Sequence, residues 1–156
     1  MKTKDYSFIY KTLLSIFNTS FSLSVQAKMS LTASILGSRF SNWNFCGFYI
    51  LVGKKFLEIG PYYGKIIPCT YINFGRGVCG TAAKLEKTII VDDVLKFHDY
   101  ISCDSETKSE IVVPIFNNNN LEAVLDIDSV KIGDFNRTDK INLKKICQLF
   151  YNKNKT

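Results

Sequence analysis

The chain has 156 residues, of which 46% are hydrophobic and 13% aromatic, so it is large and apolar enough to fold around a core. Its 20 basic and 14 acidic residues give a net charge of +6, but the basic residues are scattered and form no docking motif, so we expect no nucleic-acid partner. The five cysteines form no CxxC pair and the chain has one histidine, which predicts no metal site and a reducing compartment, the cytoplasm.

The N-terminal part of the chain is predicted to form two helices between residues 6 and 37. Apolar residues recur at helical spacing from Tyr6 to Phe17, and a second helix is expected from about Leu23 to Leu36, with Gly37 as its stop signal. Polar and charged residues interrupt the apolar stretches of this part. We therefore expect neither a signal peptide nor a membrane span.

The segment over residues 44–130 is predicted to form a sheet and its connecting loops. Strands are expected at 45–52, 56–60, 69–74, 88–91, 109–116 and 121–130, with a loop over 60–64 and a short helix over 80–86. Residues 92–108 lack periodicity and form a long loop, which in a compact domain is often functional. A helix at about 138–151 and a frayed tail over 152–156 follow. This order predicts a single α/β (α+β) domain over residues 1–156, with an antiparallel sheet.

The two last strands place acidic residues on one face of the sheet. Because side chains alternate along a strand, Asp126 and Asp128 share a face. Glu110 joins them if it pairs with Asp128, a register that gives a three-residue loop, whereas a two-residue loop without a bulge would separate the charges. Three close carboxylates could bind an ammonium group, hold a metal or supply a proton. An exposed polar sheet face would show the same pattern.

The cysteines offer several candidates for thiol chemistry. Cys79 begins the short helix, where backbone amides stabilise a thiolate, so this position favours it as the nucleophile. Cys103 lies in the long loop, which suits a thiol that must attack a ligand and then reach a second sulfur. Cys69 precedes a strand, and spacing alone favours a buried packing role over a reactive one for each of the three. We interpret Cys46 and Cys147 as packing residues.

A series of motifs resembles a known family. The series runs along the chain as NFCGFY (44–49), GPYYGK (60–65), FGRGVCGTAA (74–83), ISCDS (101–105), SEIVVP (109–114) and VLDIDS (124–129). It is similar to the free methionine-(R)-sulfoxide reductases, a family of GAF domains. The likeness is strong over about residues 44–135 and looser over the N-terminal helices, and the combination of GRGVCGTA with LDIDS makes it specific.

The resemblance implies a fold and roles for the cysteines. The fold would be a six-stranded antiparallel GAF sheet flanked by helices, with a nearly enclosed pocket. The three cysteines that matter in the family match Cys69, Cys79 and Cys103. By this match Cys103 is the nucleophile, Cys69 the resolving thiol and Cys79 an auxiliary partner. This disagrees with the preference for Cys79 above, and we follow the resemblance because a loop gives a nucleophile freedom to reach its substrate.

The resemblance also implies an activity. The chain would reduce free L-methionine-(R)-sulfoxide to methionine through a sulfenic acid and a disulfide, with a part in oxidative-stress defence. Glu110, Asp126 and Asp128 would hold the substrate ammonium, one of them acting as the acid, and Phe45 and Tyr49 would be further substrate-binding residues. No cofactor would be bound, and thioredoxin, with its reductase and NADPH, would reopen the disulfide.

Several features leave alternatives open. Phe45 stands where the family usually has tryptophan, Tyr100 where it usually has histidine, and the segment 64–69 is one residue longer than the pattern. A non-catalytic GAF domain that senses a small ligand, or a cysteine-based redox sensor, would share most of these motifs. A homodimer is expected by analogy with other GAF domains.

Overall fold

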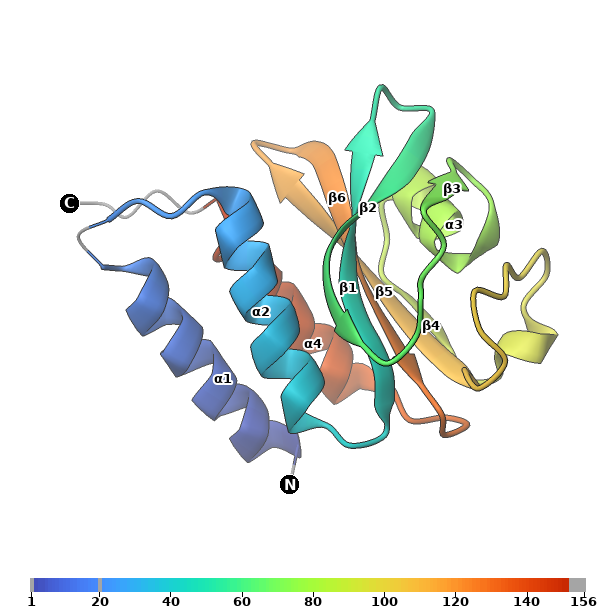
Figure 1. The fold of residues 1–156 in the computed structure, drawn as a ribbon, viewed down its shortest axis with the longest axis horizontal. Coiled ribbons are helices and arrows are strands. Elements are labelled where there is room, and N and C mark those ends of the chain that lie inside the picture. Colours follow the sequence, from blue (N-terminus) through green and yellow to red (C-terminus); the bar gives the residue numbers. More distant parts are fainter. Residues whose placement is uncertain (1, 20, 152–156) are drawn as a thin grey trace.

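The computed structural model describes residues 2–19 and 21–151, so the predicted tail over 152–156 lies outside the described residues. The helices are α1 (Lys2–Phe17), α2 (Val25–Arg39), α3 (Gly77–Leu85) and α4 (Arg137–Cys147), with a short 3-10 helix, η1 (Val94–Lys96). The strands are β1 (Trp43–Val52), β2 (Phe56–Gly64), β3 (Tyr71–Asn73), β4 (Ile89–Val91), β5 (Ser109–Asn117) and β6 (Asn120–Ser129). Figure 1 shows this arrangement.

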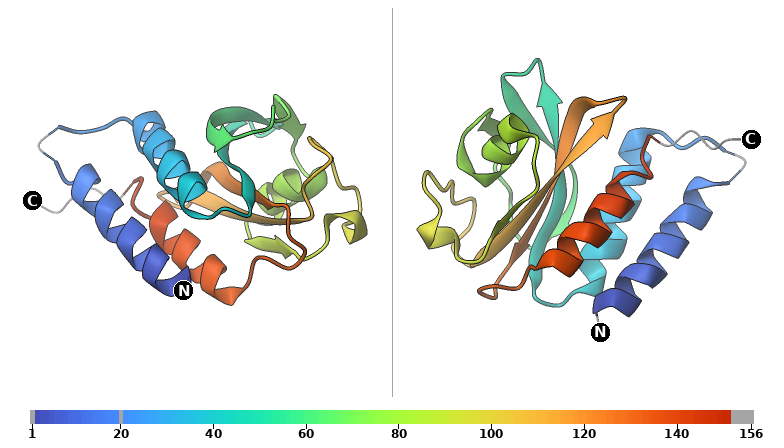
Figure 2. Two further views of the ribbon diagram at one scale, coloured as in Figure 1. Left: turned by 60° about the horizontal axis from the view of Figure 1, so that its bottom comes forward. Right: turned by 180° about the vertical axis from the view of Figure 1, so that it is seen from behind.

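The strands form one six-stranded sheet in the order β3-β2-β1-β6-β5-β4, and every neighbouring pair is antiparallel. Helices α1, α2 and α4 lie together on one side of this sheet, while α3 and the loop over residues 92–108 lie on the other side (Figures 1 and 2). The predicted α+β fold with a six-stranded antiparallel sheet is therefore confirmed. Within the ranges 2–19 and 21–151, no helix has the length and hydropathy needed to cross a membrane.

Side chains along the central strands point alternately to the two sides of the sheet, so each side has its own set of buried residues. On β6, Ala123, Leu125 and Ile127 are fully buried in the core beneath the three helices. Val124 lies on the opposite side, in a second apolar cluster with α3. Each fully buried leucine or isoleucine side chain contributes about 1.5–3 kcal/mol by leaving water. The main hydrophobic core therefore lies on the side of α1, α2 and α4. On the α3 side, the smaller apolar cluster leaves room for polar side chains.

Several predicted boundaries are wrong. The last helix, expected to reach residue 151, ends at Cys147, and the short helix expected from residue 80 already begins at Gly77. Gly37 does not end the second helix but lies inside α2, where the Tyr63 ring packs so closely that a Cβ atom would have no room. Residues 60–64 are not a loop, because β2 continues to Gly64. Pro61 is tolerated there because the β1–β2 register shifts between Gly47 and Tyr49, opposite this residue, so a missing N–H costs no regular ladder bond.

The hairpin of β5 and β6 has the predicted pairing of charges but a different turn. Glu110 pairs with Asp128, as predicted. The predicted three-residue loop is wrong, because Asn117 pairs with Asn120 and leaves a two-residue turn. The register shifts beyond Ile115, and this irregularity absorbs the extra residue. The hairpin therefore has a two-residue turn and still pairs Glu110 with Asp128.

Candidate functional site

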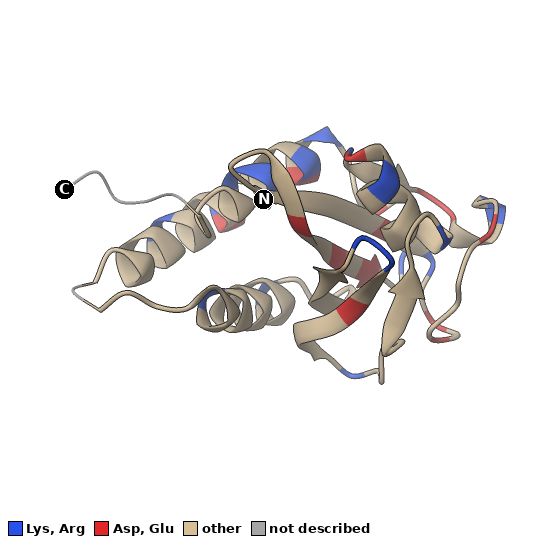
Figure 3. Cartoon of the chain, turned by 90° about the horizontal axis from the view of Figure 1, so that it is seen from above, with Lys and Arg blue, Asp and Glu red and all other residues tan. Residues whose placement is uncertain are grey.

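Three carboxylates lie side by side on the α3 side of the sheet. Glu110 on β5 faces Asp128 on β6, and Asp126 is two residues earlier on the same face. Their exposed fractions are only 5% for Glu110, 6% for Asp126 and 8% for Asp128, so the exposed polar face considered from sequence is excluded. Within the described part of the chain, no Lys or Arg forms an ion pair with them. Figure 3 shows acidic positions on strands of the sheet, with basic positions spread over helices and turns.

Burial changes the protonation of this cluster. Loss of hydration raises the pKa of Glu110 well above its ordinary value, and the neighbouring charges of Asp126 and Asp128 raise it further. Burial also raises the pKa of Asp126, to about 6. The pKa of Asp128 rises for the same reason, with Asp126 adding to the effect. A cluster of this kind favours either a bound cation or a carboxyl group that stays protonated near neutral pH.

Cys79 lies against this cluster. The turn that precedes α3 uses Gly75 and Gly77, both with positive φ, and delivers Cys79 to the first turn of the helix. Its Sγ lies 3.9 Å from Oε1 of Glu110, to which the thiol donates a weak hydrogen bond. Burial and the nearby Asp126 and Glu110 raise the pKa of this thiol well above its ordinary value. The prediction of a thiolate stabilised by the helix N-terminus is therefore wrong, because desolvation and negative neighbours outweigh the helix dipole.

The other two candidate cysteines are joined. Cys69, on the segment between β2 and β3, forms a disulfide with Cys103 in the loop over 92–108, with their Cα atoms 5.4 Å apart. Cys46, Cys79 and Cys147 are buried free thiols. Cys46 and Cys147 belong to the core on the helix side, as predicted for packing residues. The sheet thus separates the Cys69–Cys103 disulfide and the free thiol of Cys79, on the side of the acids, from the thiols of Cys46 and Cys147 on the helix side.

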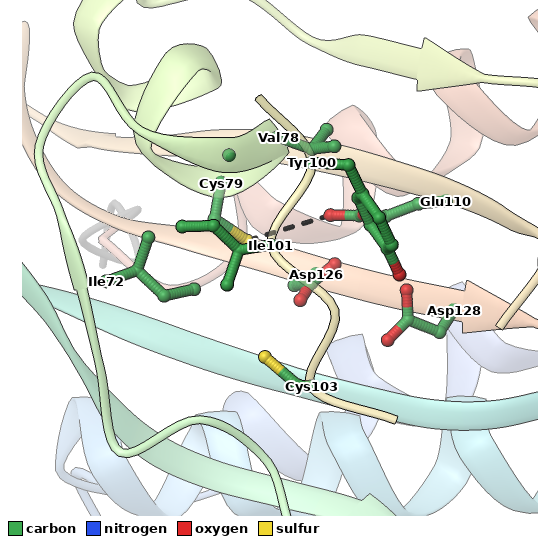
Figure 4. Close-up of a pocket in the computed structure, with 10 residues that line it drawn as sticks. Ile72, Val78, Cys79, Tyr100, Ile101, Cys103, Glu110, Asp126 and Asp128 are labelled. Atoms are coloured by element: carbon green, nitrogen blue, oxygen red, sulfur yellow. Dashed lines mark hydrogen bonds between the residues drawn. The ribbon is translucent and has the colours of Figure 1, made fainter. Parts of the chain in front are cut away.

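A pocket brings these groups together, as Figure 4 shows. Its lining consists of Ile72, Gly77, Val78, Cys79, Tyr100, Ile101, Cys103, Glu110, Asp126 and Asp128. Cys103 and the acids therefore share one cavity, with Cys79 between apolar side chains. The cavity volume is about 20 Å³, room for about one water molecule. In this form, with Cys69 and Cys103 bonded, the pocket is small.

Phe45 and Tyr49 lie beside this pocket without lining it. Phe45 on β1 pairs in register with Asp128, and its ring stacks on Tyr62 at 5.7 Å between centroids. The hydroxyl of Tyr49 donates a hydrogen bond of 3.1 Å to the backbone carbonyl of Cys69. Tyr49 thus holds the segment that carries one sulfur of the disulfide. Direct contact of Phe45 and Tyr49 with a substrate stays a prediction.

Asp104 was missed by the reasoning from sequence. Its carboxylate accepts hydrogen bonds from the backbone N–H groups of Glu106 at 2.6 Å and Thr107 at 2.9 Å, and Thr107 Oγ1 also donates to it. Asn44 on β1 in turn donates a bond of 3.0 Å to Thr107 Oγ1. Asp104 therefore fixes the turn that follows Cys103. The run Asp-Ser-Glu-Thr is a typical Asx-turn signal and could have indicated this role.

Ile101 and Tyr100 were also not predicted to line the pocket. Ile101 packs over Gly77, where a Cβ atom would lie 3.1 Å from its side chain. Outside the pocket, Arg76 and Asp99 form a two-pronged ion pair, including a bond of 2.7 Å, that links the turn before α3 to the long loop. Such an exposed pair adds little stability but orients the two segments. Arg76 and Asp99 are close only because the long loop folds back to the turn before α3, and no local pattern in the sequence indicates this pair.

The sheet order, the helices on one side and the enclosed pocket on the other define a GAF-type domain. The GAF domain family model matches residues 26–150. The chain is 39% identical over 120 residues to the free methionine-R-sulfoxide reductase of Escherichia coli, covering 77% of this chain and 72% of that protein. It is 46% identical over 109 residues to the protein of that name from Saccharomyces cerevisiae, covering 68% of this chain and 60% of the yeast protein.

Solved structures agree with these relatives. A free methionine-R-sulfoxide reductase from Neisseria meningitidis, solved in complex with its substrate, superposes with a TM-score of 0.86 at 33% identity, over 94% of this chain and 86% of that one. The chain belongs to the GAF domain family and, within it, to the free methionine-R-sulfoxide reductases, which are oxidoreductases.

Proposed function

We propose that this chain reduces free L-methionine-(R)-sulfoxide to L-methionine, with Cys103 as the nucleophile and Cys69 as the resolving thiol. The observation that carries the proposal is the bond between Cys69 and Cys103 beside a pocket lined by three buried acids. The Neisseria relative, solved with its substrate, supports the choice of substrate.

The reaction begins on the reduced chain. The thiolate of Cys103 attacks the sulfoxide sulfur while a carboxyl group donates a proton to the sulfoxide oxygen. Glu110, whose pKa is raised by burial, is suited to keep this proton at neutral pH. Methionine leaves, the oxygen passes to Cys103, and a sulfenic acid forms. Cys69 then attacks this sulfur, releasing water and giving the disulfide.

The remaining acids select the free amino acid. The ammonium group of methionine sulfoxide carries one positive charge, and the buried carboxylates have no cationic partner among the described residues. We place the ammonium beside Asp126 and Asp128, where it would offset their repulsion. A methionine within a peptide has no ammonium to offer, so it would leave the carboxylates unpaired.

An external dithiol must close the cycle. Two thiols of thioredoxin would reduce the disulfide by exchange and would themselves be reoxidised to a disulfide, which thioredoxin reductase reduces with NADPH. Thioredoxin is kept reduced in the cytoplasm, and we place the chain there. Phe45 and Tyr49 would form the outer wall of the pocket once it opens, and Cys79 would assist the exchange.

The test is turnover of free L-methionine-(R)-sulfoxide with thioredoxin, thioredoxin reductase and NADPH. We expect NADPH oxidation with wild type, none with Cys103→Ser, and release of one equivalent of methionine but no turnover with Cys69→Ser. Cys147→Ala, which removes a thiol of the helix-side core, should turn over like wild type.

Two outcomes would contradict the proposal. Absence of NADPH oxidation with folded, reduced wild type would favour a ligand sensor or a redox sensor instead. A full equivalent of methionine from Cys103→Ser would show that another thiol attacks. N-acetylmethionine sulfoxide provides a matched substrate control, since it lacks the ammonium group and should react poorly.

A further inference from the structure

We propose that Cys79, Glu110 and Asp126 form a binding site for Zn²⁺ or a similar thiophilic divalent cation. One ligand atom from each residue, a sulfur and two carboxylate oxygens, lies within 4.8 Å of the other two. Zinc readily takes one thiolate with carboxylates, whereas Mg²⁺ and Ca²⁺ prefer oxygen alone. Three protein ligands on three elements, α3, β5 and β6, would leave a position open for water or another pocket group.

An unpaired oxygen points independently to a ligand at this place. Oδ1 of Asp126 is buried and accepts no hydrogen bond of ordinary geometry within residues 2–19 and 21–151, although Cys79 and Glu110 lie beside the same carboxyl group. In Figure 4 the carboxylate of Asp126 lies between Cys79 and Asp128 and projects into the pocket. A buried acceptor without a partner costs about 1–3 kcal/mol, and more for a charged group. A cation bound to this oxygen would remove that cost.

The size of the cavity fits an ion better than an organic ligand. About 20 Å³ is room for about one water molecule, and a zinc ion is no larger. Cys79 is a free thiol while Cys69 and Cys103 are bonded, so the three ligands are available in the oxidised chain. On binding, the Cys79 thiol gives its proton to solvent and its sulfur coordinates the metal, with no change in oxidation state.

The site does not require the proposed reaction. The sequence prediction of no metal site rested on cysteine and histidine spacing, although three close carboxylates were also considered able to hold a metal. The fold adds the sulfur of Cys79 to two of those acids. If the proposed function holds, the cation would occupy the place of the substrate ammonium, so zinc and methionine sulfoxide would exclude each other. That consequence rests on the proposed function, whereas binding itself does not.

The experiment uses the oxidised chain, freed of reductant, and titrates it with Cd²⁺ as a spectroscopic probe for zinc. Cadmium bound to a thiolate gives an ultraviolet sulfur-to-metal charge-transfer band. We expect the band to saturate at one equivalent and to disappear when Zn²⁺ is added in excess. Cys79→Ser should abolish it, and Cys147→Ala, which removes a free thiol outside the pocket, should keep it.

Asp126→Asn provides a second arm that leaves the thiol in place. The band should persist while the dissociation constant rises by more than about 100-fold, the upper range for loss of a group that merely supports a metal ligand. Asp92→Asn, an exposed acid outside the pocket, should leave the constant unchanged.

A band of wild-type amplitude in folded Cys79→Ser, or no band in wild type, would overturn the site. An unchanged dissociation constant in Asp126→Asn would do the same, and this arm decides the matter if Cys79→Ser fails to fold. Failure of the chain to reduce methionine sulfoxide would not alter any of these titrations, so the two proposals fail separately.

Discussion

At the scale of single residues, Asp126 links burial to pH dependence. Its pKa is raised from 3.8 to about 6, mainly by loss of hydration. The folded chain therefore holds this proton more tightly than the unfolded chain does. Between about pH 4 and pH 6 the folded state carries more protons, so the free energy of unfolding falls as pH rises and the loss is complete above the folded pKa.

Asp126→Asn should therefore stabilise the fold at high pH. At pH 8 the variant avoids a buried negative charge, and we expect its free energy of unfolding to exceed that of wild type by about 1–3 kcal/mol. At pH 4 the two should be nearly equal, because the aspartate is then largely protonated. Urea unfolding at both pH values measures this, with Asp92→Asn as an exposed control. A variant that is weaker than wild type by the same amount at both pH values would contradict the argument.

The same residues show what sequence predicts at this scale. Period-two alternation was enough to place Asp126 and Asp128 on one face, because strand geometry leaves no other choice. The protonation of Cys79 was predicted with the wrong sign. Its position at a helix N-terminus is local and readable, whereas the acids that face it come from strands about thirty residues or more along the chain.

At the scale of elements, α3 lies unusually close to the chain that leads into it. The N–H of Gly75 donates a hydrogen bond of 2.9 Å to the carbonyl of Gly80. A Cβ atom at Gly80 would meet the backbone carbonyl of Asn73 and would lie 3.0 Å from the backbone nitrogen of Gly75. Backbone atoms cannot swing aside as a flexible side chain can. This close contact holds Cys79 in place.

Gly80→Ala should accordingly destabilise the chain despite alanine's better helix propensity. Overpacking costs about 1–3 kcal/mol, against a gain of up to about 1 kcal/mol from propensity. We expect a lower melting temperature by calorimetry and a weaker Cd²⁺ band, because Cys79 is displaced. Thr81→Ala, the adjacent position of the same helix, is the matched control and should change stability little. A melting temperature for Gly80→Ala equal to or above that of wild type would refute this account.

In the β5–β6 hairpin the strand register was predicted correctly, but the turn length from which it was derived was wrong. The pairing of Glu110 with Asp128 was derived from a three-residue loop, but the turn residues are Asn118 and Asn119, both with positive φ. Two-residue turns of this kind match the twist of a hairpin. Glu122 has no partner in the register and absorbs the difference. Four consecutive asparagines fit either turn, so local sequence could not decide between them.

At the scale of the whole molecule, the disulfide ties together two distant segments, one of which lines the pocket. It joins residues 34 apart in sequence, tying the segment before β3 to the loop over 92–108. The motifs predicted the family and hence the sheet, helices and thiols. The closed volume could not be predicted, because it depends on how Ile101, Tyr100 and Cys103 pack over the acids.

Binding of L-methionine, the proposed product, should therefore depend on the redox state of the chain. With the Cys69–Cys103 bond closed, the cavity of about 20 Å³ cannot hold an amino acid, so we expect no binding to the oxidised chain by isothermal titration calorimetry. Reduction frees the loop that carries Cys103, and the reduced chain should bind with a measurable heat. Cys69→Ser cannot form the bond and should bind with or without reductant, while Cys147→Ala should behave like wild type. Equal affinity of the oxidised and reduced chains would mean that the pocket opens independently of the disulfide. Methionine could then leave either before or after the disulfide forms.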